Sequence, residues 1–374
     1  MYRGNLKGGL DIDLGYGADW AERSEYWRTH RLPRRGPPRK FTYREPLIIG
    51  GHGARVRVDR GSLLIQDGFT HYPQKRKEIR LFFGDPNLPD RIVMLDGSGG
   101  ITFDALSWIS DQKISLVKIN WRGEATFVGG SSGYSAKKEF CEAQNNFRGT
   151  KSASVFSRQL LEQKIRNSIS TLKNFTANSQ NRDGAILGLE KMLAEFLKLK
   201  EPIPGSKLLG IEGGAASVYF RGWLGIPLKW EQLWKKPVPA SWREIGPRMM
   251  SWQKRSENAR HPVNAMLNYG YAMLVGQLRG ELIAQGIDPT IGIAHSTART
   301  KIALVYDLME PLRPVVDQIV LRFVLARTFA PADFSINSAG ACRINPQLAA
   351  AVAREMTTID GAPEIVRSYL GCLA

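Results

Sequence analysis

Three titratable residues lie close together in an apolar stretch near the C-terminal end of the chain. His295, Asp307 and Glu310 fall within the segment from Ile291 to Asp317, and the two acids are three positions apart. On a helix this spacing would put both carboxylates on one face, one turn from each other. Together with Glu212, further upstream, they offer carboxylate oxygens and one imidazole, a combination that suits Mg²⁺ or Mn²⁺.

Two prolines, Pro311 and Pro314, follow these acids directly. Proline has no backbone N–H, so in a helix the carbonyls of Asp307 and Glu310 would lose their usual partners. A chain that breaks its own helix beside buried acids gives up local stability, which is typical of functional sites. A second interpretation stays open at this point, namely a core helix with a capping acid and a salt-bridged Arg313.

The charge of the chain indicates the class of partner. There are 52 Lys and Arg residues against 35 Asp and Glu residues in 374, a formal net charge of +17. Such a field attracts polyanions, of which nucleic acid is the usual one, although a basic surface can also serve solubility alone. A hard cation held in a DNA-binding protein can polarise a phosphodiester. Metal-dependent chemistry on DNA is therefore one function these residues would support, although other acid-and-histidine sets in a long chain look similar.

The composition excludes other classes. No apolar run is long enough to span a bilayer, and the N-terminus lacks the apolar core of a secretion signal, so no membrane partner is expected. The cysteines, Cys141, Cys342 and Cys372, have neither a zinc-ligand spacing nor the pattern of a disulfide framework. This usage predicts a reducing cytoplasm.

The sequence divides into three regions, whose patterns predict a two-domain α+β protein that positions the candidate residues. Residues 1–40 read as a basic N-terminal arm interrupted by prolines. Residues 41–146 carry short strands separated by Gly and Asp turns, which favours a β-rich, sandwich-like domain. Residues 147–374 show helical periodicity and would form an all-helical catalytic domain.

Within the helical region, some elements bear on the site. A glycine-rich turn is expected at 210–214, which would put Glu212 near a helix start. A strong helix should run from Pro262 to Gln285 and end at Gly286. The last helix is expected from about Pro346 to Met356.

Four segments together look like one known family. They read LLGIEG at 208–213, PVNAMLNYGY at 262–271, IDPTIGIAH at 287–295 and YDLMEPLRP at 306–314. In order, spacing and residue type they resemble the CRISPR-associated spacer-acquisition integrases, Cas protein one. The resemblance covers roughly residues 41 to 345. Each segment alone would be weak, and the combination is specific.

The resemblance implies a metal-dependent DNA integrase and endonuclease that inserts short DNA pieces into a repeat array. By similarity, Glu212, His295 and Glu310 would be the metal ligands, and Asp307 would support the site or approach the metal. The family usually forms a homodimer, and two dimers are bridged by a small partner subunit, Cas protein two.

The resemblance also points to residues around the metal. Tyr271 matches a tyrosine near the reacting phosphate, although a buried core tyrosine is an equally open interpretation. Asn264 and Arg255 match residues that flank the site. A basic surface holds DNA through its phosphates, and further contacts to DNA are expected from Arg299, Lys301 and Lys164.

One departure stands out: Ser217 occupies a position where the family often carries an arginine. The predicted reaction is a transesterification, in which the 3′-hydroxyl of a DNA fragment attacks a phosphodiester at a repeat border. Two other functions remain open. One is a stand-alone metal nuclease or transposon-like integrase acting on branched DNA, and the other is a DNA-binding scaffold without catalysis.

Overall fold

The structure is a computed structural model that describes most of the chain beyond residue 45. The described ranges are residues 46–69, 76–130, 136–176, 179–231, 237–247, 259–295, 302–338, 340–356, 359 and 361–373. The predicted arm, residues 1–40, lies outside them. Within these ranges, none of the helices has both the length and the apolar character needed to cross a membrane.

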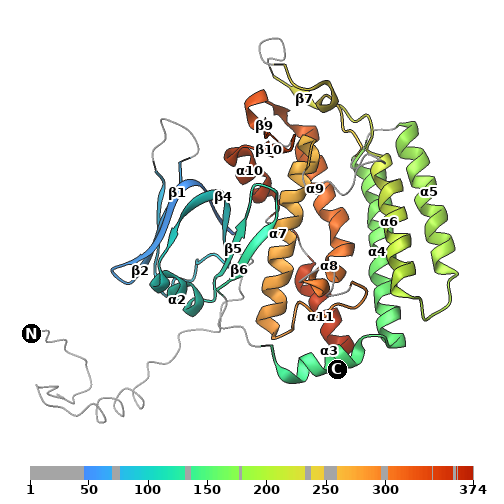
Figure 1. Cartoon of the computed structure of the whole chain (residues 1–374), viewed down its shortest axis with the longest axis horizontal. Helices are drawn as coiled ribbons and strands as arrows, with labels where there is room; N and C mark the ends of the chain where they lie inside the picture. Colours follow the sequence, from blue (N-terminus) through green and yellow to red (C-terminus); the bar gives the residue numbers. More distant parts are fainter. Residues whose placement is uncertain are drawn as a thin grey trace, which may run out of the picture. The chain divides into compact units, whose positions relative to one another are not determined.

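The N-terminal part of the described chain forms one mixed sheet of six strands (Figure 1). The middle strands β1, β4 and β5 pair in parallel, and the outer pairs are antiparallel. In spatial order the strands are β3 (Glu78–Leu81), β2 (Ser62–Gln66), β1 (Leu47–Asp59), β4 (Arg91–Ile101), β5 (Ser115–Ile119) and β6 (Ala125–Gly129).

The β-rich N-terminal region is confirmed, but its strands form one sheet covered by helices on both faces and not two packed sheets. Neighbouring residues of β4 point to opposite sides: Ile92 packs into a small core with Trp108 of α2 (Phe103–Asp111), whereas Val93 packs into the large core shared with the helices. A sheet buried on both faces needs apolar residues at consecutive positions, which explains its near-continuous apolar runs. The six strands therefore bury their apolar side chains against helices and need no second sheet packed on them.

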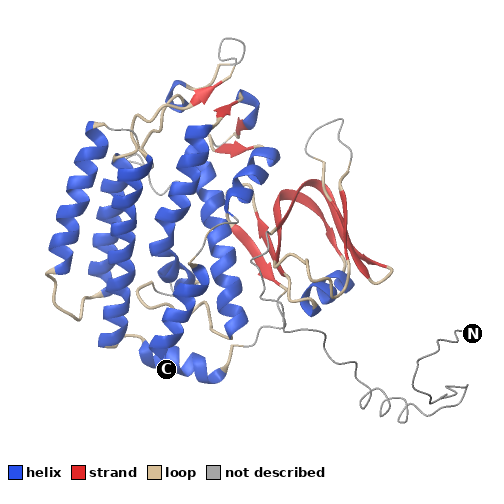
Figure 2. Cartoon of the chain, turned by 180° about the vertical axis from the view of Figure 1, so that it is seen from behind, coloured by secondary structure: helices blue, strands red, loops and turns tan. Residues whose placement is uncertain are grey.

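The remainder is mainly helical, as predicted, and Figure 2 shows the helices gathered beside the six strands. Its helices are α3 (Lys138–Phe147), α4 (Lys151–Phe175), α5 (Gln180–Leu197), α6 (Gly205–Arg221), α7 (Pro262–Gln285), α8 (Ala303–Met309), α9 (Arg313–Ala326), α10 (Pro346–Glu355) and α11 (Ala362–Leu373). Short strands accompany them: β7 (Lys229–Trp230), β8 (Thr328–Phe329), β9 (Phe334–Ile336) and β10 (Cys342–Ile344). Helices α3 and α11 were not predicted.

All described residues fall within one compact unit, Arg44–Ala374. Its largest core contains Val117 and Ile119 of the sheet together with residues of most of the helices. The division of the chain at residue 146 stays a prediction.

Helix α7 joins the sheet to the other helices, and it begins and ends where the sequence predicts. Pro262 occupies its first turn, and Gly286 closes it in the left-handed conformation at φ 79°. Two glycines let α7 pack closely against β5 and against α9. A Cβ on Gly276 would lie 3.0 Å from Val117 of β5, and one on Gly270 would lie 2.6 Å from Val316 of α9.

The expectation that Glu212 lies near a helix start is wrong. Gly210 to Gly214 continue the helix without interruption, so Glu212 stands in the middle of α6. The predicted turn does not form because α6 packs along α4 and α5, and tertiary packing readily overrides the low helix propensity of glycine.

The two prolines do break the helix beside the acids. The carbonyl of Asp307 accepts from the N–H of Glu310, three residues on, and the carbonyl of Glu310 accepts in the same way from Arg313. Residues Glu310–Leu312 therefore form one turn of 3₁₀ helix (η2) between α8 and α9. Asn167 of α4 donates to the carbonyl of Pro311 at 2.8 Å, which ties α4 to the break.

Candidate active site

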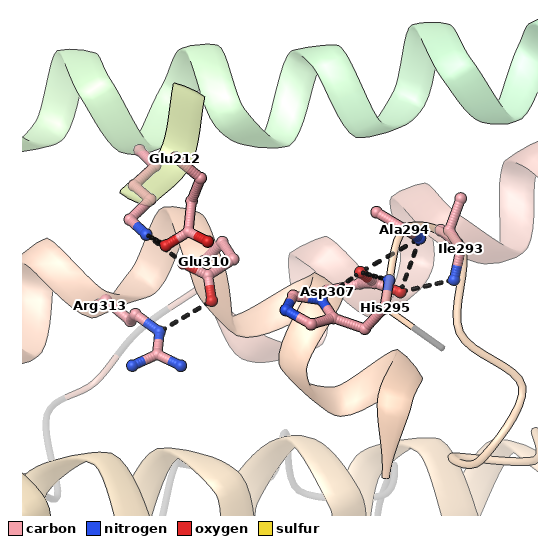
Figure 3. Close-up of polar contacts among 8 residues, drawn as sticks. Glu212, Ile293, Ala294, His295, Asp307, Glu310 and Arg313 are labelled. Atoms are coloured by element: carbon pink, nitrogen blue, oxygen red, sulfur yellow. Dashed lines mark hydrogen bonds and ion pairs between the residues drawn. The ribbon is translucent and has the colours of Figure 1, made fainter. Parts of the chain in front are cut away.

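Asp307 organises one half of the site. Its carboxylate is almost fully buried and accepts from the backbone N–H groups of Ile293, at 2.5 Å, Ala294, at 3.3 Å, and His295, at 3.0 Å. Three consecutive amides that converge on one carboxylate fix the path of the loop before His295 (Figure 3). The loop is held at its other end as well, because the side chain of buried Gln144 pairs with the backbone of Asp288 at 2.9 and 3.0 Å.

The same carboxylate orients the histidine ring. Nδ1 of His295 lies 2.7 Å from Oδ1 of Asp307, so Nε2 is the ring nitrogen that could bind a metal. This hydrogen bond favours the charged ring, and the pKa of His295 is raised although burial opposes the charge. Asp307 therefore orients the His295 ring, and its position behind the ring argues against direct ligation.

Glu212 and Glu310 form the other half of the site. Their carboxylates approach each other from α6 and η2 (Figure 3), and Nζ of Lys164, on α4, donates to Oε1 of Glu212 and to Oε2 of Glu310. The remaining oxygen of Glu310 accepts from Nε of Arg313 at 2.9 Å. Burial disfavours ionised Glu310, but the positive charges of Arg313 and Lys164 prevail and lower the pKa of this carboxyl.

The two halves meet at a small cavity of about 40 Å³. Its wall includes all four predicted residues, Glu212, His295, Asp307 and Glu310, from three separate segments of the chain. Two carboxylates and one imidazole nitrogen at such a cavity have the donor chemistry that Mg²⁺ or Mn²⁺ accepts. The residues present therefore fit a hard divalent ion in kind.

The three proposed ligands, Glu212, His295 and Glu310, do not surround a common point in this structure. In the described part of the chain, no three His, Cys, Asp or Glu side chains lie close enough together to hold a metal ion. The reason is visible in the contacts: the ammonium of Lys164 stands between Glu212 and Glu310, and His295 is turned toward Asp307.

A larger cleft of about 460 Å³ adjoins this cavity. Lys164 and Arg313 line this cleft, and Tyr271 lines it from α7. Glu212 lines both the cleft and the small cavity. The Tyr271 hydroxyl donates to Oδ1 of Asp317 at 2.5 Å, and the Arg313 guanidinium lies over its ring at 5.0 Å. Tyr271 is 8% exposed, so it is both a core tyrosine and part of a cleft wall.

The other residues predicted to contact DNA lie in different surroundings, and some lie outside the described residues. Lys164 is only 7% exposed and belongs to the acid cluster, which the sequence did not indicate. Asn264 is half-buried in the first turn of α7. Arg255, Arg299 and Lys301 lie outside the described residues.

Reasoning from the sequence missed the part played by three residues. Arg313 entered only as an ion pair in the less specific interpretation, and that ion pair with Glu310 exists alongside the acid cluster. Gln144 and Asp317 were not singled out. For Asp317 a signal was available, because an acid within an apolar helical stretch indicates a buried polar partner.

The chain resembles one protein family over most of its length. The sequence model of the CRISPR associated protein Cas1 family matches residues 47–358. "CRISPR-associated protein Cas1 3" of Methanobrevibacter ruminantium is 27% identical over 249 residues, which span 62% of this chain and 66% of the relative. "CRISPR-associated endonuclease Cas1 1" of Methanospirillum hungatei is 37% identical over 139 residues, 37% of this chain and 36% of that protein.

Solved structures share the fold. The protein titled "Casposase bound to integration product" superposes with a TM-score of 0.67 at 21% identity, covering 84% of this chain and 82% of the casposase. A Cas1 protein from Thermotoga maritima superposes with a TM-score of 0.63 at 16% identity, covering 87% and 94% of the two chains. At these identities the agreement concerns the fold alone.

Proposed function

This chain belongs to the CRISPR-associated Cas1 family, and on that premise we propose that it is a metal-dependent DNA integrase and endonuclease of CRISPR adaptation. It joins the 3′-hydroxyl of a short DNA fragment to a phosphodiester at the border of a repeat array. The relatives named endonucleases support this class of reaction. The net charge of +17 supports a polyanionic substrate.

The convergence of Glu212, His295, Asp307 and Glu310 on one cavity carries the proposal. Glu212, Glu310 and Nε2 of His295 would hold Mg²⁺ or Mn²⁺. Asp307 fixes the imidazole ring through Nδ1 and fixes the loop that carries it. A metal ion bound there would polarise the phosphodiester and offset charge on the attacking and leaving oxygens.

Residues of the larger cleft would hold the DNA beside this cavity. Arg313 is anchored by Glu310, so its position is fixed before the substrate arrives. Tyr271 is fixed in the same way by Asp317. Groups that are already oriented lose little entropy when the reacting phosphate arrives, which favours the reactive geometry.

The assembly follows from the family. A structural neighbour is a "Cas6-RT-Cas1--Cas2 complex", with a TM-score of 0.63 and 16% identity, covering 90% of this chain and 35% of that one. This title supports association with a small Cas2-type subunit, and we propose that the subunit bridges two homodimers of this chain. Its place of action is the cytoplasm, where the free thiols of Cys141, Cys342 and Cys372 would stay reduced.

The decisive experiment measures strand joining and DNA binding in the same preparation. E212Q and E310Q should each reduce joining of a labelled fragment to a repeat-bearing plasmid, with Mn²⁺ or Mg²⁺, by on the order of a thousandfold. Binding of the same DNA should change little, because most affinity comes from phosphate contacts elsewhere. E190Q is the matched control, since Glu190 lies on neighbouring α5 in an exposed ion pair with Lys173.

Each outcome separates one function from another. Full joining by both E212Q and E310Q would refute the assigned site. Metal-dependent cutting of branched DNA without joining at repeats would favour the stand-alone nuclease. Joining without a preference for repeats would favour an integrase of a mobile element. Absence of any metal-dependent chemistry would leave a DNA-binding scaffold.

A further inference from the structure

Lys164 occupies the place between the two carboxylates that would hold the metal. Its side chain leaves α4, is 7% exposed, and donates from Nζ to both Glu212 and Glu310. Lysine is seldom buried unless it is paired. The pairing here is with two proposed ligands at once, so a protein cation already neutralises part of the ligand set.

The contacts of Lys164 offset the repulsion between the two carboxylates in the metal-free protein. Two carboxylates that share a confined site repel each other. Lys164 bridges them, and Arg313 holds the outer oxygen of Glu310. Lys164 therefore holds the two proposed ligands close together before any metal binds.

The bridge and a metal ion exclude each other. A divalent ion bound by the facing oxygens of Glu212 and Glu310 would take the position of Nζ, and the ammonium would be repelled by its charge. The lysine side chain has a flexible four-carbon stem, and Lys164 also lines the adjoining cleft of about 460 Å³. The ammonium can therefore move into that cleft without leaving the site region.

We propose that Lys164 is a positioning residue that stands in for the divalent cation and is displaced into the cleft when the metal binds. There its charge becomes available to a DNA phosphate, so metal loading and substrate binding support each other. The inference rests on the proposed function, because it requires that Glu212 and Glu310 bind a metal.

The first test uses the wild-type protein. Lysines are modified with an amine-reactive acetylating reagent, with and without Mn²⁺, and each site is followed by mass spectrometry. Lys164 should react slowly without metal and at least about fivefold faster with Mn²⁺, because its two charge-assisted hydrogen bonds are then broken. Lys173, on the same helix and half-exposed in an ion pair with Glu190, should react at one rate in both states.

The second test measures Mn²⁺ affinity by titration calorimetry. K164M keeps a side chain of similar length without the charge, so Mn²⁺ no longer has to displace an ammonium. Its Kd should be about tenfold lower than that of the wild type, since hydrogen bonds to charged groups no longer oppose binding. K173M removes one lysine from the same helix and should bind Mn²⁺ as the wild type does.

The outcomes distinguish this inference from the function on which it rests. If the wild type and K164M both bind no Mn²⁺, the proposed metal site is wrong. If the wild type binds Mn²⁺ while Lys164 reacts at an unchanged rate, the inference alone is overturned. If K164M does not fold, the labelling of the wild type decides.

Discussion

Replacing Asp307 by asparagine would keep the shape of the side chain and remove its charge. The Asp307 carboxylate accepts from three backbone amides and from Nδ1 of His295, and both of its oxygens take part. An asparagine can present its carbonyl oxygen to one side only. Its NH₂ group would then face N–H donors on the other side, where no hydrogen bond can form.

The expected loss follows from these contacts. At least two hydrogen bonds to a buried carboxylate would disappear, each worth about 1.5–3 kcal/mol. We expect the free energy of unfolding of D307N to fall by about 3 kcal/mol or more, measured by urea denaturation without metal. The His295 ring would lose its orienting partner, so Mn²⁺ affinity should fall by about 10–100-fold in calorimetry.

A control in the same loop separates charge from mere substitution. Asp288 accepts from the N–H and the hydroxyl of Thr290 through Oδ1 alone, at 2.8 and 2.7 Å. D288N retains a carbonyl oxygen for these contacts and should change stability by only about 0.5 kcal/mol. Our reasoning would be refuted if D307N matched D288N in both stability and Mn²⁺ affinity.

Two further changes test the frame that surrounds the site. His261 donates from Nε2 to the carbonyl of Glu244 at 2.9 Å and accepts at Nδ1 from the N–H of Val263 at 3.2 Å, and burial lowers its pKa from 6.5. Below about pH 6.5 the unfolded chain takes up a proton that the folded protein refuses, so stability should fall with pH more steeply in the wild type than in H261Q, measured by urea denaturation at several pH values. G270A should lower the free energy of unfolding by about 1–3 kcal/mol in urea, because its Cβ would lie 2.6 Å from Cγ1 of Val316.

Each of these has its own control. His52 is an exposed residue within β1, so H52Q is the matched control for the loss of a histidine. A Cβ at Gly213 would meet no atom within 4 Å, so G213A should be tolerated or slightly stabilising. Equal pH slopes for the wild type and H261Q, or equal stability of G270A and G213A, would contradict the packing described here.

The sequence contains most of the information about the helices around the site because local signals set their limits. The limits of α7 come from a proline in its first turn and a glycine after its last, and both act through the backbone of one segment. The break after Asp307 follows in the same way from Pro311 and Pro314. These features depend on neighbours in sequence, so pattern reasoning finds them.

Features that depend on distant partners could not be predicted in this way. The parallel pairing of β1 with β4 is decided by which strands meet in space, and the strand pattern alone fits a sandwich equally well. The glycines around Glu212 suggest a turn, but packing of α6 against two other helices keeps them helical. Lys164 read as one of several bases on a helix, because its partner Glu310 is 146 residues away.

That separation has a consequence for the timing of synthesis. Four hydrogen bonds join α4 to the η2 and α9 region, and they span 146, 144, 143 and 147 residues. At a translation rate of roughly 5–20 residues per second, about 7–30 seconds pass between the emergence of Lys164 and that of Glu310. Within that interval Glu212 emerges 83 residues before His295 and 98 residues before Glu310, so the growing chain carries it for a time without the other two proposed ligands. A chain truncated in this interval would lack Glu310, so the proposed site would be incomplete however well α4 had folded.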